Sequence, residues 1–211
     1  GYDNVVIGRQ AGYGMTSAHS SVMVGAGAGK ASTTANLNTS VGFNALFTNT
    51  TGNYNVAIGD LAMSGNVGGS RQVAVGHEAM RMFTQAGDVQ NTAVGQKAMY
   101  NIQTGSHNTA VGNEAMFGAT GDDNDYNVAL GSQALYAIDA GDANTAVGYQ
   151  AGYRLTTASE NVLIGQYAGA ALTTGGNNVI IGHAAGDTLT TGNLNVMIGD
   201  GAVGTATVGT A

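Results

Sequence analysis

The residues of this chain that could perform chemistry are few and widely spaced. Its carboxylates are most concentrated in two stretches, one holding Asp88 and the other holding Asp122, Asp123 and Asp125. Clustered carboxylate oxygens are ligands that Ca²⁺ prefers, so these stretches are candidate calcium sites. Their spacing matches neither an EF-hand loop nor a nonapeptide calcium repeat, which favours solvated acidic loops. We therefore expect no metal site and no cofactor.

The other polar side chains show no catalytic arrangement. Glu78 and Glu114 would need a groove to act as a glycosidase pair, and with Lys97 between them they fit an alternating column of surface charge better. The histidines are too far apart in sequence to form a metal-ligand set. They are His19, His77, His107 and His183. With no phosphate loop, dinucleotide fingerprint or serine-histidine-aspartate order, we expect no enzymatic activity.

Composition excludes several further classes of function. The 211 residues include 35 glycines but no proline, cysteine or tryptophan, so disulfides and thiolate metal sites are impossible. The formal net charge of −7 argues against nucleic-acid binding, which needs clustered cations. Apolar runs such as residues 179–181 are too short for membrane insertion. Because Gly1 falls within a pattern repeated later, we expect a processed chain or a segment of a longer one.

A short repeat accounts for nearly the whole chain. Each copy has a polar residue, three mostly apolar residues, a glycine, two variable residues and an alanine, and the spacing between copies is 17 residues in nine cases and 19 in two. The copies begin at Asn4, Ser21, Asn38, Asn55, Gln72, Asn91, Asn108, Asn127, Asn144, Asn161, Asn178 and Asn195. Residues 1–203 therefore form one repeat array, and residues 204–211 are a C-terminal tail or the start of another segment.

Each place in the repeat, counted from its polar first residue, has a structural interpretation. The invariant fifth-place glycine, as in Gly8, predicts a corner where a Cβ would not fit, and the invariant eighth-place alanine, as in Ala11, predicts a thin interior. The β-branched second and fourth places predict a strand with these side chains facing inward. A later apolar place predicts a second short strand. Its members are Ile102, Ile138, Leu155, Leu172 and Leu189.

A coil of two short strands predicts an all-β fold, a β-solenoid of about twelve 17-residue coils. Stacked at about 4.8 Å per coil, it would form a rod roughly 50 Å long. The third place should then face outward and is almost always apolar, as in Val6, Ala57 and Ile180, so that face needs a cover. We expect a parallel homotrimer around this column. The first-place asparagines should form a ladder of bonded amides.

Larger apolar side chains allow two further interpretations. Middle copies place Leu46, Met63, Met80, Met99, Met116 or Leu135 after the common alanine, where outer copies have glycine. This change favours altered packing over a methionine-based ligand site. Aromatic residues recur nearby, and those after the alanine are expected to pack between coils rather than meet a receptor. The aromatic residues are Phe43 and Tyr149, and, after the alanine, Tyr13, Phe47, Tyr100, Phe117, Tyr136 and Tyr153.

The repeat text resembles a known family. The pattern in residues 144–153, Asn-Thr-Ala-Val-Gly-Tyr-Gln-Ala-Gly-Tyr, and that in residues 172–178 are similar to repeats of bacteriophage tail fibres and of YadA-like trimeric adhesin heads, over essentially residues 1–203. The resemblance implies a left-handed β-roll trimer and a role in attachment or as a spacer. Coils here are longer than the shortest adhesin-head repeats, which predicts a larger outer surface.

The resemblance implies a structural and adhesive module of a phage tail fibre, an extracellular, virion-borne rod that serves host attachment. Its partners would be its own copies, with host-surface polysaccharide or an outer-membrane protein as receptor. A bacterial cell-surface adhesin head is the alternative, and a flanking chaperone domain or membrane anchor would separate the two. An ice-binding β-roll is a further alternative, because paired threonines recur at Thr156, Thr173 and Thr190.

Overall fold

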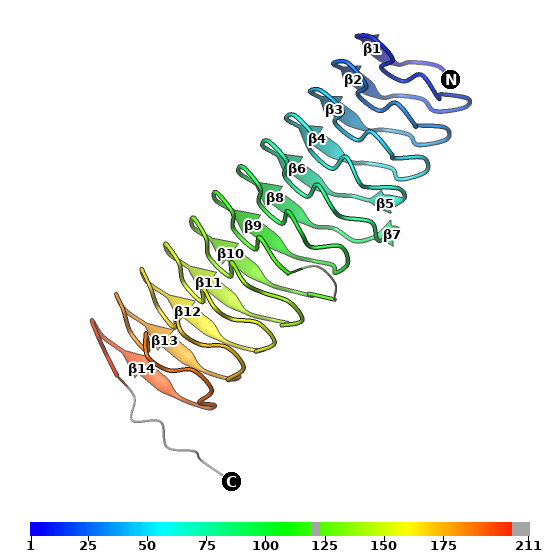
Figure 1. Cartoon of the computed structure of the whole chain (residues 1–211). Coiled ribbons are helices and arrows are strands. Elements are labelled where there is room, and N and C mark those ends of the chain that lie inside the picture. The colour runs from blue at the N-terminus through cyan, green and yellow to red at the C-terminus, as the bar shows by residue number, and fades with distance from the viewer. Residues whose placement is uncertain (120–122, 204–211) are drawn as a thin grey trace.

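The computed structural model describes residues 1–119 and 123–203, which form a single stack of coils with β1 and β14 at opposite ends (Figure 1). The predicted all-β solenoid with coils of about 17 residues is confirmed. The described residues contain no helix, and hence none able to span a membrane. The expected tail, residues 204–211, lies outside them. The strands are β1 (Val5–Ile7), β2 (Val22–Val24), β3 (Thr39–Val41), β4 (Val56–Ile58), β5 (Gly69–Ser70), β6 (Val73–Val75), β7 (Gly87–Asp88), β8 (Thr92–Val94), β9 (Thr109–Val111), β10 (Val128–Leu130), β11 (Thr145–Val147), β12 (Val162–Ile164), β13 (Val179–Ile181) and β14 (Val196–Ile198).

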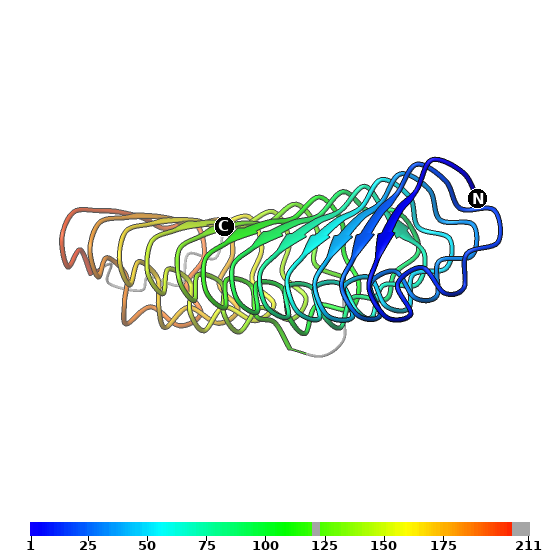
Figure 2. The same cartoon turned by 90° about the horizontal axis from the view of Figure 1, so that it is seen from above.

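Twelve strands of the described chain form one parallel sheet along the rod (Figures 1 and 2). Equivalent places pair throughout, as Val128 does with Thr145. The register is kept across both 19-residue spacings, where Val73 pairs with Thr92 and Thr109 with Val128. The two extra residues are therefore absorbed outside this sheet, and every coil presents the same face.

The third-place side chains lie inside the coil, contrary to the predicted outward orientation. Ala129 is fully buried, whereas its strand neighbours Val128 and Leu130 face outward and are partly exposed. The column is buried from Met23 through Met197. The predicted orientation of the strand was wrong because it placed the bulkier β-branched side chains of the second and fourth places in the core. A thin, close-packed interior instead takes the smaller member of each strand.

The predicted second strand does not form, although its apolar residues are buried as expected. The left-handed backbone at the seventh and ninth places, with φ of 55° at Lys97 and 53° at Met99, precedes the predicted strand, and the residues around Ile102 form bends and irregular backbone rather than an extended segment. Neighbouring coils are joined here by single hydrogen bonds, such as Met99 N to Ala115 O at 3.0 Å. Within the described residues, the pair β5–β7 is the only additional sheet.

The fifth-place glycines occupy a corner that other residues cannot, as predicted. At Gly95 the φ is +134°, and a Cβ there would lie 2.3 Å from the carbonyl oxygen of Gly112 in the next coil. That oxygen is backbone and cannot move aside without shifting the coil. The repeated glycine therefore sets the close approach of successive coils.

The two sides of the core are complementary in size. In five coils alanine at the third place is matched by methionine or leucine at the ninth, and in three coils a large third-place residue is matched by glycine there, whereas the coil of Ala146 and Gly152 is small at both places. The first kind is Ala57 with Met63, Ala74 with Met80, Ala93 with Met99, Ala110 with Met116 and Ala129 with Leu135; the second is Met23 with Gly29, Leu163 with Gly169 and Ile180 with Gly186. The methionines are fully buried, which supports the packing interpretation.

The first-place asparagines form the predicted ladder. Asn161 donates both its backbone N–H, at 3.1 Å, and its side-chain amide, at 3.0 Å, to Oδ1 of Asn144 in the preceding coil. Asn144 Nδ2 in turn donates to the carbonyl of Ala158 at 2.8 Å. Gln72 interrupts the ladder, because its longer side chain directs its amide to Asn66 instead. The buried amides thus fix each coil to the next.

Candidate functional site

The outward face of the twelve-stranded sheet carries no charged side chain. This outer sheet face is formed by the second- and fourth-place side chains, all of them Val, Ile, Leu or Thr. Val111, Leu130 and Ile164 are each 38% exposed and Ile58 is 40% exposed. A contiguous apolar face of this kind marks an interaction surface. The outer sheet face, rather than the third place, is therefore the apolar face for which a cover is expected.

A second surface feature is a stack of rings on the segment that follows the common alanine. The tenth-place residues Tyr100, Phe117, Tyr136 and Tyr153 stack in four successive coils and are here called the aromatic ladder. Successive ring centroids lie 5.3, 5.1 and 5.0 Å apart with interplanar angles of 7°, 9° and 14°. Their predicted packing between coils is confirmed. Partial burial, then Glu114, then Tyr153 raise the pKa of Tyr136 above its usual 10.0.

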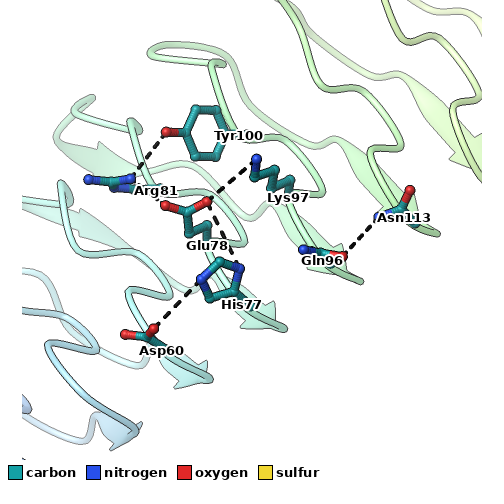
Figure 3. A network of polar contacts seen from close by, with 8 residues as sticks. All are labelled: Asp60, His77, Glu78, Arg81, Gln96, Lys97, Tyr100 and Asn113. Atoms are coloured by element: carbon teal, nitrogen blue, oxygen red, sulfur yellow. Dashed lines mark hydrogen bonds and ion pairs between the residues drawn. The ribbon is translucent and has the colours of Figure 1, made fainter.

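The ladder's amino-terminal end is covered by charged side chains (Figure 3). The Arg81 guanidinium lies 5.8 Å from the Tyr100 ring centroid and donates to its hydroxyl at 3.2 Å. The Lys97 ammonium lies 5.6 Å from the same centroid. Cations at this distance are attracted to an aromatic ring, so this end of the ladder is closed.

Glu78 joins the two cations in the same network (Figure 3). Its side chain is 11% exposed, pairs with Arg81 and lies 3.8 Å from Lys97 Nζ. The charge of this nearly buried carboxylate is thus compensated by two neighbouring cations. The predicted charge column is present between Glu78 and Lys97, whereas Glu114 accepts a hydrogen bond from Gln133 at 2.9 Å. Neither carboxylate lines the grooves beside Tyr13 and Tyr153.

The acidic stretches use their carboxylates within the protein. Asp88 pairs with Arg71, and Asp125 Oδ1 accepts from the backbone N–H and the hydroxyl of Ser106 at 2.6 and 2.8 Å. Asp122 lies outside the described residues, and Asp123 is exposed. Over residues 1–119 and 123–203, no three His, Cys, Asp or Glu side chains gather as a metal site would require.

The histidines take separate positions in four different coils. His19 stacks on Tyr2, and His107 stacks on Tyr126 at a centroid distance of 5.0 Å. His77 Nε2 lies 3.6 Å from an Asp60 carboxylate oxygen in the network of Figure 3. His183 Nδ1 lies 2.7 Å from Asp200 Oδ1. Each contact joins neighbouring coils, and the structure does not bring the histidines together.

The recurrent threonines hydrogen-bond along the rod. Thr156 and Thr173 donate from Oγ1 to the carbonyls of Thr173 and Thr190 at 3.1 and 2.9 Å. The same bond joins Thr33 to Thr50 at the other end of the array. Hydroxyls that donate to the backbone have lost the proton they would offer to ordered water. This geometry weakens the motivation for an ice-binding surface.

The remaining aromatic residues lie apart from the ladder. Tyr13 is exposed, so its predicted packing between coils was wrong, because no aromatic ring lies at its register in the next coil, which has Lys30 there. Tyr13 and Phe47 flank a groove lined by three successive coils, in which the Lys30 ammonium lies 5.0 Å from the Phe47 ring centroid. Tyr149 makes an edge contact with Tyr167 at 5.4 Å, and Phe43 is exposed. Residue type and register predicted the ladder, but they did not predict which of its ends is open. No model of a known family, no curated protein and no solved structure matches this chain.

Proposed function

We propose that the chain is a rod-forming, adhesive module of an extracellular attachment fibre of the phage tail-fibre type, assembled from three parallel copies. The observation that carries the proposal is the outer sheet face, which continues without a charged side chain from β1 to β14. An apolar strip of this length is unfavourable in water and is stabilised when copies of the chain cover it.

The dimensions of the sheet suit a threefold assembly. Each strand has three residues, which at about 3.3 Å per residue makes the sheet roughly 10 Å wide. Three faces this narrow close around a common axis with side chains filling the centre. All strands of the sheet are parallel and in register, so parallel copies place identical coils at the same height. The repeat resemblance favours three copies over two.

The internal bonding supports a mechanical role. Successive coils are joined by the parallel sheet, the asparagine ladder and the aromatic ladder, and each of these runs along the rod axis. A solenoid coupled in this way resists bending because any bend must stretch several ladders together. A stiff spacer that presents its flanks outward is what an attachment fibre requires.

A charge on the outer sheet face tests the assembly. Ile164→Lys places three ammonium groups near the proposed axis and should convert the trimer to monomer with the coils still folded, because the side chain points away from the coil interior. Gln166→Lys is the matched control, since Gln166 is exposed two residues away and lies outside the outer sheet face. Both variants are compared by light scattering and circular dichroism. Equal masses for the two variants would contradict the proposal.

A further inference from the structure

The aromatic ladder ends on an uncovered ring. Tyr136 covers one face of Tyr153 at a centroid distance of 5.0 Å. In the next coil the equivalent place is Ala170, whose methyl group is too small to cover the other face. A groove of about 430 Å³ opens there, lined by Gln150, Tyr153, Arg154, Ala170, Ala171 and Asp187. Ligand sites commonly have volumes of this order.

Polar groups with unused hydrogen-bonding capacity surround this ring face. Arg154 and Asp187 are exposed, and their side chains make no hydrogen bond or ion pair with any residue the structure describes. Gln150 donates from Nε2 to Gln133 at 2.7 Å, which fixes its side chain and leaves Oε1 to accept. The groove thus offers a guanidinium donor, a carboxylate acceptor and an amide oxygen around an aromatic platform.

We propose that this groove binds a neutral hexopyranose of the galactose type. Such a sugar presents three C–H groups on one face, which stack on an aromatic ring, and a rim of hydroxyl groups that both donate and accept. Asp187 accepts from hydroxyls, and Arg154 donates to them. Because the charges of Arg154 and Asp187 cancel, the groove does not select a net anion or a net cation.

The groove beside Tyr13 lacks this combination. Its threonines, among them Thr33 and Thr48, donate their hydroxyl protons to backbone carbonyls, and Lys30 covers the Phe47 ring. Its charged groups are limited to one ammonium, with no carboxylate to accept from a sugar. Phe47 therefore serves as a control aromatic residue on the same flank of the repeat.

The sugar site rests on the proposed function, for which it supplies the ligand of attachment. None of the six lining residues belongs to the outer sheet face, so that face can be covered without using a residue of the groove. Three copies would present three equivalent sites around the rod. Weak individual binding would then be multiplied by simultaneous engagement of a multivalent glycan.

Saturation-transfer NMR on the full chain with methyl β-galactopyranoside tests the site. We expect transfer to the C–H groups of one sugar face, and an affinity lowered by about tenfold or more in Tyr153→Ala. Tyr153→Phe keeps the ring and should stay within about threefold of the parent chain. Ala170→Leu removes no proposed contact but fills the space over the ring, and it should abolish the transfer.

The outcomes separate this proposal from that of the trimeric rod. No transfer in the parent chain, or unchanged transfer in both Tyr153→Ala and Ala170→Leu, overturns the sugar site. Phe47→Ala should bind as the parent chain does, and a loss there equal to that in Tyr153→Ala also overturns it. The mass of each variant in solution is recorded in parallel. A trimer that binds no sugar would support the trimeric rod and overturn the sugar site. A monomer that binds sugar would support the sugar site and overturn the trimeric rod.

Discussion

The side chain of Leu163 occupies the space that a side chain at Gly169 would need, since a Cβ on Gly169 would lie 2.9 Å from Leu163 Cδ2. Both residues belong to one coil, on opposite sides of its core. In another coil the third place is Ala57, and the ninth place holds Met63, which is fully buried. In most coils one of the two places therefore supplies the large core residue, whereas the space beside Gly152, whose third-place partner is Ala146, is approached by Leu135 and Leu163 of the neighbouring coils.

Exchanging the two sides of one coil should reveal this coupling. Leu163→Ala leaves a cavity and should cost about 2 to 5 kcal/mol of unfolding free energy, and Gly169→Met should cost about 1 to 3 kcal/mol by overpacking. The double variant recreates the arrangement of Ala57 and Met63. Its loss should be smaller than the sum of the single losses by at least about 1 kcal/mol, measured by denaturant unfolding. Additive losses would show that the two sides pack independently.

The fifth-place corner should be intolerant of any Cβ. Gly95→Ala would bring the new methyl group 2.3 Å from the Gly112 carbonyl oxygen, and we expect a loss of at least about 3 kcal/mol. Gly87 provides the control, because its φ is +100° but nothing lies within 4 Å of a Cβ there. Gly87→Ala should cost only the backbone strain, roughly 1 kcal/mol. Equal thermal shifts for the two variants would contradict the steric account.

The asparagine ladder should contribute more to stability than surface amides do. Asn144→Ala removes the acceptor of the Asn161 N–H and the donor to Ala158 O, both in buried surroundings. Leaving these groups unpaired should cost about 2 to 4 kcal/mol. Asn113→Ala, at an exposed site bonded to Gln96 at 3.3 Å, should change the unfolding free energy by less than about 0.5 kcal/mol. Similar unfolding midpoints for the two variants would show that the asparagine ladder stabilises the fold no more than a surface amide does.

The aromatic ladder should make stability depend on alkaline pH. Because the pKa of Tyr136 is raised above 10.0 in the folded chain, an unfolded chain ionises this phenol first. The stabilising contribution is thus complete below pH 10 and is lost as the pH rises through the folded-state pKa. Tyr136→Phe should lose less stability than the parent chain over that interval. Tyrosinate absorbance should show Glu114→Gln lowering the pKa of Tyr136, and no change would exclude a contribution from Glu114.

Much of the fold followed from the period and the invariant residues. The spacing of Gly95 and Gly112 gave stacked coils, and the repeated asparagines gave a bonded ladder. The orientation of the strands did not follow, because alternation in a strand such as Thr145–Val147 is compatible with either face inward. The small third-place residue, such as Ala146, is the signal in the sequence that this place faces the coil interior. A thin interior explains it in the same way as it explains the eighth-place alanines. The β-branched neighbours fit a core equally well when one chain is considered without a covering partner.

Of the candidate sites, the sequence predicted the aromatic ladder but not the groove at its open end. The ladder of Tyr100 and Tyr153 followed from register, since residues one repeat apart lie above one another. The groove at its open end depends on Ala170 and Asp187 in the next two coils, and on which polar groups are already engaged. Sequence spacing does not report hydrogen-bond partners, so the groove is not predictable from the sequence.

The molecular mass in solution tests the central claim most directly. Packing of three outer sheet faces predicts a particle of three times 21.0 kDa by light scattering, independent of protein concentration well above the dissociation constant. Such a mass, reduced to one chain by Ile164→Lys, would support the fibre module. A folded monomer of 21.0 kDa at high concentration would contradict it, since the apolar outer sheet face would then be stable in water without a partner.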